Sequence, residues 1–139
     1  MREEADRWLS FAREDLRMAE LALQAEIFNQ TCFHSQQCVE KALKGALVLG
    51  GTAPPRTHRL VDIFALLNLP VVTDFAMDIR LLDRFYIPTR YPDALPGTLP
   101  EGLPNQQDAD EALATARQVL EIIEEVMKLD QGEGGSQGE

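Results

Sequence analysis

The chain has 139 residues, of which 45% are hydrophobic, and it carries a formal net charge of −10 at pH 7. This length suits one domain with one core, and the acidic balance excludes bulk electrostatic binding to a nucleic-acid backbone, which needs a field of lysines and arginines. No apolar run approaches the roughly 20 residues of a membrane span, and the opening MREEADRW lacks a secretory pattern, so we expect a cytoplasmic protein without a membrane partner.

The first predicted element is a long amphipathic helix. Its apolar residues recur at alternating steps of four and three, which places them on one stripe. The residues of this stripe are Ala5, Leu9, Ala12, Leu16, Ala19 and Leu23. Trp8, Phe11 and Met18 widen it beyond the needs of one bundle seam. Because an isolated domain rarely leaves such a patch in water, we expect a homodimer.

A second helix is predicted from about Asn29 to Leu49, and Gly50-Gly51 supplies the stop. One side of it is apolar and includes Cys32, Val39, Ala42, Ala46 and Leu49. Cys32 and Cys38 lie about 240° apart around this helix, so a mutual disulfide is implausible and both are expected to be buried, reduced thiols. We find no Cys or His cluster with metal-ligand spacing and expect neither a metal nor a cofactor.

A polar stripe follows the same helix at steps of four and three. Its residues are Gln30, His34, Gln37, Lys41 and Lys44. The plain interpretation, which periodicity alone favours, is a solvated face. The alternative is an anion groove, in which two lysines one turn apart neutralise a phosphate while His34 and Gln37 donate hydrogen bonds.

The connector TAPPRTHRL leads to a short helix that carries Leu60, Ile63, Phe64 and Leu67, with Thr57 as its expected N-cap. His58 follows this cap and is flanked by Arg56 and Arg59. A histidine there is more often a packed or capping residue than a base, although the segment could hold a phosphate.

A fourth helix is predicted over residues 73–86, with Phe75, Ile79, Leu82 and Tyr86 in phase, and Pro88 prevents its continuation. A long Pro-rich loop follows, beginning YIPTRYPDALPG. Three roles are open for Arg90 in this loop. It could pair with Asp93, or it could cap the carbonyls at the end of the preceding helix. Alternatively, the flanking prolines could hold it for a bidentate contact to phosphate. Tyr86 and Tyr91 could stack on a base or donate their hydroxyls.

The last helix is predicted to open with a capping box of Asp108 and Glu111. Its apolar face includes Ala109, Leu113, Ala116, Leu120, Ile123 and Met127. The domain therefore spans residues 1–130, and QGEGGSQGE at 131–139 is predicted to be a disordered tail. With no strand-like alternation of useful length, the fold class is all-α, and an up-and-down bundle is favoured.

Four blocks, taken in order, resemble a HEPN domain over about residues 3–130. They are FAREDLRMAELAL, CFHSQQCVEKALKGAL, RTHRL and LDRFYIPTRYPD. The resemblance implies a four- or five-helix up-and-down bundle, commonly a homodimer, and often produced beside a minimal nucleotidyltransferase. Members of the family include toxin ribonucleases, and a related domain is the substrate-binding half of larger nucleotidyltransferases.

Ribonuclease members of that family carry a histidine four to six residues after an arginine near the end of the fourth helix. Arg90 is followed by YPDALP, which contains no histidine, so no catalytic residue is assigned. The resemblance leaves Lys41, Lys44, Arg90 and Tyr91 as the expected nucleotide- or phosphate-binding residues. The expected function is a module that binds nucleotide or nucleic acid beside a nucleotidyltransferase, within a toxin–antitoxin pair; the alternatives are a metal-independent ribonuclease and a purely structural dimer.

Overall fold

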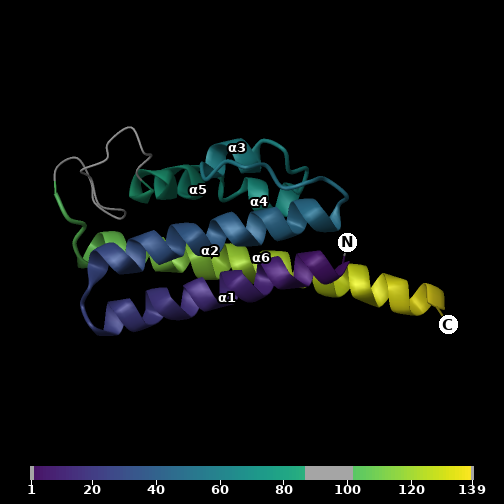
Figure 1. The fold of residues 1–139 in the computed structure, drawn as a ribbon, viewed down its shortest axis with the longest axis horizontal. Coiled ribbons are helices and arrows are strands. Elements are labelled where there is room, and N and C mark those ends of the chain that lie inside the picture. The colour runs from purple at the N-terminus through teal and green to yellow at the C-terminus, as the bar shows by residue number, and fades with distance from the viewer. Residues whose placement is uncertain (1, 87–101, 139) are drawn as a thin grey trace.

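The computed structural model describes the backbone of residues 2–86 and 102–138, and side chains within this part as far as Leu129. Three long helices lie side by side along the longest axis of the molecule: α1 (Arg2–Gln24), α2 (Phe28–Leu49) and α6 (Gln106–Gly138) (Figure 1). A layer of short elements covers α2 on the side away from α1. It consists of α3 (Leu60–Phe64), α4 (Pro70–Thr73), α5 (Ala76–Leu82) and the 3-10 turn η1 (Asp83–Phe85).

The chain runs up and down through this bundle. In Figure 1, α1 and α2 are antiparallel, the α3–α5 layer returns along α2, and α6 runs in the direction of α2. The described residues form helices and turns but no β-strand. The predicted all-α, up-and-down bundle is therefore confirmed. None of the described helices is long and apolar enough to cross a membrane.

Helix α2 is the centre of the bundle, because it is buried on more than one side. Val39, Leu43 and Leu47 have almost no exposed surface. Gly45 allows α1 to approach closely, since a Cβ there would lie 3.1 Å from both Leu9 Cδ2 and Trp8 Cβ. Gly45 is therefore a point of close contact between α1 and α2.

The apolar stripe of α1 is confirmed, with Ala5, Leu9, Ala12 and Ala19 buried in the core. The residues that widen it behave differently from one another. Trp8 is partly buried against the core, whereas Phe11 is 51% exposed and Met18 49% exposed. An apolar patch does remain on the outer face of α1; the homodimer expected from it stays a prediction.

Both cysteines lie on the buried side of α2 and are unpaired, as predicted. Burial raises the pKa of the Cys32 thiol to about 12. Burial also raises the pKa of Cys38, and the nearby Asp15 carboxylate acts in the same direction. Because the thiolate is the reactive form, both side chains are inert packing groups.

The single fourth helix predicted over residues 73–86 is wrong. Helix α4 ends at Thr73 and α5 begins at Ala76, while Phe75 has φ −103° and ψ 9°, outside the helical region. Three β-branched residues precede the break, and such residues are poor helix formers. The predicted shared face of this segment is nevertheless confirmed for Ile79 and Leu82, because both side chains are buried in the core.

The predicted cap of α3 is also wrong. Arg59 occupies the N-cap position without a side-chain cap bond, and Thr57 Oγ1 accepts from Arg59 N at 3.1 Å. The first amides of α3 instead donate to a residue distant in sequence: Leu60 N lies 2.6 Å from Asp83 Oδ1, and Val61 N lies 3.1 Å from Asp83 Oδ2. Burial raises the pKa of Asp83 despite these two hydrogen bonds, which act to lower it.

Helix α6 begins two residues before the predicted cap Asp108. Asp108 N donates to Asn105 Oδ1 at 2.9 Å, and Asn105 N donates to Asp108 Oδ2 at 3.0 Å. A capping box is therefore present, but it pairs Asn105 with Asp108 and not Asp108 with Glu111. At its other end the backbone of α6 continues as helix to Gly138. This segment, 131–138, is the one expected to be a disordered tail, and its disorder in solution stays a prediction.

Candidate functional site

The polar stripe of α2 is not a freely solvated face, because Lys44 is buried, the other four residues are partly buried, and His34, Lys41 and Lys44 each contact a carboxylate. One group, the Asp15 cluster, consists of Asp15, His34 and Lys41. His34 Nδ1 lies 2.8 Å from Asp15 Oδ1, and Lys41 Nζ donates to Asp15 Oδ2. Burial acts to raise the pKa of Asp15, but the hydrogen bonds from His34 and Lys41 outweigh it and hold that pKa below its usual value.

A second group, the Glu40 cluster, lies further along α2 and consists of Glu40, Lys44, Gln37 and His58. Lys44 Nζ donates to Glu40 Oε2 at 3.1 Å, and Gln37 Nε2 donates to Oε1 at 3.2 Å. His58 Nδ1 lies 3.1 Å from Oε2 and 3.3 Å from Oε1. The Glu40 side chain is 4% exposed and that of Lys44 is 6% exposed, whereas that of His58 is 52% exposed.

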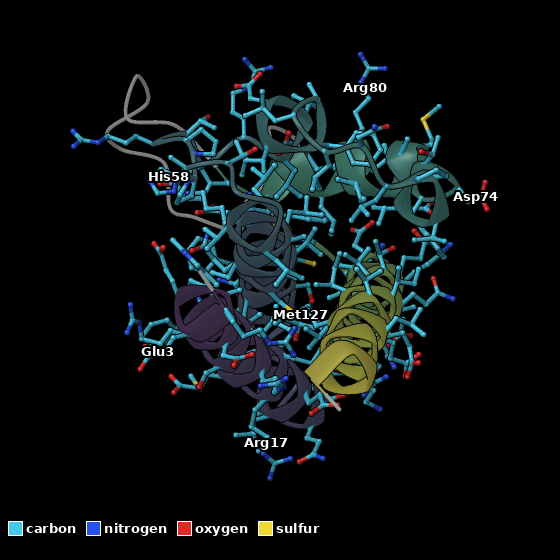
Figure 2. The ribbon with its side chains drawn as sticks, turned by 90° about the vertical axis from the view of Figure 1, so that its right-hand side faces the viewer. Glu3, Arg17, His58, Asp74, Arg80 and Met127 are labelled. Carbon is cyan, nitrogen blue, oxygen red and sulfur yellow. The ribbon has the colours of Figure 1, made fainter. Side chains whose placement is uncertain are left out.

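The position of His58 is fixed by its backbone as well as its ring. Gln36 is fully buried, and its Nε2 donates to the carbonyl of His58 at 2.9 Å. Gln36 Oε1 in turn accepts from Gln37 Nε2 at 2.7 Å. Buried amides on α2 therefore hold the connector between α2 and α3 against the Glu40 cluster. Figure 2 shows His58 beside α2, on the side away from α6.

Aromatic rings join the two clusters. The Phe33 ring meets the His34 ring edge-on at 5.3 Å and stacks with Tyr86 at 6.1 Å. The centroids of the Tyr86 and His58 rings lie 4.9 Å apart, with 31° between the ring planes. Burial raises the pKa of Tyr86, and the Glu40 carboxylate adds to this effect. The Asp15 cluster, Phe33, Tyr86 and the Glu40 cluster thus form one continuous strip along α2.

The four predicted binding residues have different outcomes. Lys41 and Lys44 do lie on one stripe, but each is engaged by its own carboxylate, and the Lys41 side chain is 26% exposed against 6% for Lys44. Lys44 also lies over the Trp8 ring, 5.6 Å from its centroid. Arg90 and Tyr91 lie outside the described residues. Whether these four residues converge on a ligand therefore stays a prediction.

The two carboxylates that organise the strip were missed in the sequence. Asp15 lies in phase with Ala12 and Ala19 on the core stripe of α1. A charged residue in a buried stripe is almost always paired, and that signal could have identified it. Glu40 lies one turn before Lys44 and next to the buried Val39, where an i, i+4 pair with the lysine was predictable.

The strip combines two lysine–carboxylate pairs with an exposed imidazole and a phenol beside it. Within the described ranges, no group of three or more His, Cys, Asp or Glu side chains could hold a metal ion.

Comparison with known proteins gives one family. The family model described as HEPN domain matches residues 5–126. A Methanocaldococcus jannaschii protein named "Putative toxin MJ1304" is 31% identical over 128 residues, which is 84% of each chain. The crystal structure of ST0689, an archaeal HEPN homologue, has a TM-score of 0.72 at 32% identity and covers 88% of this chain and 97% of its own. The crystal structure of TT1696 from Thermus thermophilus has a TM-score of 0.71 at 35% identity, covering 87% of this chain and 96% of its own.

Proposed function

The chain belongs to the HEPN domain family, and from that premise we propose that it is a module that associates with a minimal nucleotidyltransferase and helps bind nucleotide or nucleic acid. One observation supports this most: Tyr86, which joins the two clusters of the strip, stacks with Phe33 and lies tilted against His58. Tyr86 immediately precedes the segment that carries Arg90 and Tyr91. The strip and the expected anion-binding residues are therefore adjacent along the chain.

A local anion site is compatible with an acidic protein. The net charge of −10 repels a phosphate at long range, but at physiological ionic strength such a field is screened beyond about 8 Å. At contact distance a lysine point charge and an arginine fork form charge-assisted hydrogen bonds to phosphate. Lys41, with part of its side chain in solvent, and Arg90 are the direct contacts in this proposal, whereas Lys44 is buried and neutralises Glu40.

The nucleotidyltransferase is proposed as the partner from the family, and the toxin name of the archaeal relative supports the proposal of a toxin–antitoxin pair. The test of association is co-expression of this chain with a tagged minimal nucleotidyltransferase from the same genome. We expect the two proteins to co-purify in a fixed ratio through gel filtration. Separate elution of both proteins at micromolar concentration would contradict the proposed partnership.

Nucleotide binding is tested by calorimetry with a purine triphosphate. We expect a dissociation constant between about micromolar and millimolar, equivalent to roughly 4–8 kcal/mol. Lys41→Ala and Arg90→Ala should each weaken binding, because each removes one charged donor. Lys128→Ala is the matched control, since Lys128 is exposed and pairs with Glu125 on α6. The same flat trace for wild type and all variants would show that the isolated chain has no such site.

A ribonuclease is the second candidate, favoured by the toxin name of the relative. We expect no intrinsic cleavage, because proton transfer by a positioned side chain contributes a factor of about 10² to 10⁴ and no histidine follows Arg90 at the family's spacing. The test uses highly purified protein and a labelled RNA in the presence of EDTA. Cleavage that is lost in Arg90→Ala would replace the binding module with an enzyme.

A further inference from the structure

Of the three ionisable side chains in the Glu40 cluster, only that of His58 is exposed to solvent. Glu40 and Lys44 are buried, and their charges cancel across the 3.1 Å contact between Lys44 Nζ and Glu40 Oε2. His58 contacts the same carboxylate but is 52% exposed. When His58 takes up a proton, the cluster gains one net positive charge, and that charge lies on the only one of the three ionisable groups that a ligand can touch.

His58 is also oriented for such a contact. Its Nδ1 faces Glu40 at 3.1 Å, which leaves Nε2 on the opposite side of the ring, directed away from the carboxylate. Tyr86 lies against the ring at 4.9 Å, and Gln36 holds the His58 carbonyl at 2.9 Å. The imidazole is therefore positioned before a ligand arrives, which reduces the entropy lost on binding.

The charged groups around His58 favour an anion. Arg56 and Arg59 flank it in sequence, and both are exposed. Arg59 lies 4.0 Å from Asp62, and Arg56 has no ion pair within the part of the chain that the structure describes. Among the residues that the structure describes, the carboxylate in contact with the imidazole is that of Glu40, whose charge Lys44 already balances.

We infer that His58 is a phosphate contact of this protein, and that a nucleotide phosphate binds there with uptake of a proton by the imidazole. The inference rests on the proposed nucleotide-binding function and names a contact outside the four binding residues expected from the sequence. The phosphate oxygen accepts a hydrogen bond from Nε2–H, while Nδ1–H continues to donate to Glu40. A nearby anion favours the charged form of the ring, so binding and protonation are coupled.

His34 is the internal control, because these are the chain's two histidines and both are held by a carboxylate. His34 is mostly buried and meets the Phe33 ring edge-on. The experiment is nitrogen-detected NMR of histidine-labelled full-length protein, titrated with inorganic pyrophosphate at constant ionic strength. We expect the His58 signals to shift toward those of a protonated ring, and to shift by more than the His34 signals. Equal responses of both rings, or of neither, overturn the inference.

His58→Asn separates charge from structure, because asparagine keeps an N–H donor for Glu40 but takes up no proton. We expect pyrophosphate and purine triphosphate to bind roughly ten- to hundredfold more weakly, the factor for one lost charge-assisted hydrogen bond. Lys128→Asn, an exposed position on α6 outside the strip, should leave both affinities unchanged. Equal affinity of His58→Asn and wild type for pyrophosphate overturns the inference.

The two proposals fail in different ways. If purine triphosphate binds but the His58 signals do not respond to either ligand, the nucleotide-binding function stands and the His58 contact is overturned. If pyrophosphate shifts His58 but no purine triphosphate binds, the contact is supported as a phosphate site and the proposed nucleotide function falls.

Discussion

Asp15 and Glu40 determine what the lysines of α2 can do. In the sequence, Lys41 and Lys44 lie one helical turn apart, and this spacing predicts two cations that face a ligand together. The structure gives each lysine its own carboxylate, one from α1 and one from α2. Periodicity showed that the lysines share a stripe, but it could not show that Asp15 lies opposite Lys41, because that contact joins residues on different helices.

The Asp15 cluster should contribute to stability in a pH-dependent way. Asp15→Asn keeps the shape of the side chain but removes the negative charge, which leaves Lys41 and His34 without their counter-charge. We expect the free energy of unfolding at neutral pH to fall by about 1–3 kcal/mol. Glu124→Gln is the matched control; its ion pair with Arg13 is largely exposed, so its loss should cost no more than about 1 kcal/mol.

The sign of the pH effect follows from the lowered pKa of Asp15 in the folded protein. A carboxylate with a depressed folded pKa stabilises the fold fully above its unfolded pKa, and this contribution is lost as pH falls through the folded value. The difference between wild type and Asp15→Asn should therefore shrink as pH falls below about 4. Urea unfolding, monitored by circular dichroism, measures this difference in the free energy of unfolding. A difference that grows as the solution is acidified would contradict the role of Asp15.

At the scale of helices, the predictable elements were the long ones, in which hydrophobic residues recur at steps of three and four over many turns. Helix α2 begins at Phe28, one residue before its predicted start, and ends at Leu49 as predicted. The short elements were harder, because α3 is capped by Asp83 from a distant turn. The break between α4 and α5 was missed for a similar reason. A five-residue helix is stabilised by its tertiary contacts, and these are not written in its local sequence.

The contact between α1 and α2 depends on Gly45. A Cβ at this position would lie 3.1 Å from Leu9 Cδ2 and from Trp8 Cβ, which is closer than ordinary packing. Gly45→Ala should therefore push the helices apart and lower the free energy of unfolding by about 1–3 kcal/mol, as overpacking does. Gly50→Ala is the control, since the nearest atom to its Cβ, Leu47 O, lies 3.6 Å away. Thermal unfolding of both variants tests this, and a Gly45→Ala protein as stable as wild type would show that α1 can shift without cost.

At the scale of the whole molecule, the sequence predicted the fold class and the family but not the binding partners of the protein. Four sequence blocks were enough to indicate a HEPN domain, because their order and spacing reflect one packing arrangement of helices. The same blocks do not identify a partner. Partner recognition depends on which surface residues remain exposed after folding, and Trp8, Phe11 and Met18 had equal weight in the sequence although Trp8 is partly buried.

The outer face of α1 is the surface on which we expect a second copy of the chain to dock. Phe11 and Met18 are about half exposed, and a hollow of about 210 Å³ lies on this face, lined by Glu4, Arg7, Trp8 and Phe11. Exposed apolar groups clustered in this way gain free energy when a partner covers them. Light scattering at micromolar concentration should therefore give a mass about twice that of the 15.5 kDa chain.

A charged substitution on this apolar face tests where the dimer forms. Met18→Asp should give a monomer with an unchanged circular dichroism spectrum, because a carboxylate buried between two copies would lose its hydration without gaining a partner. Met77→Asp is the matched control: Met77 is 66% exposed on α5, in the layer on the other side of α2. A dimer that persists in Met18→Asp and is lost in Met77→Asp would move the interface to the α3–α5 layer, and a monomeric wild type would contradict the expected homodimer.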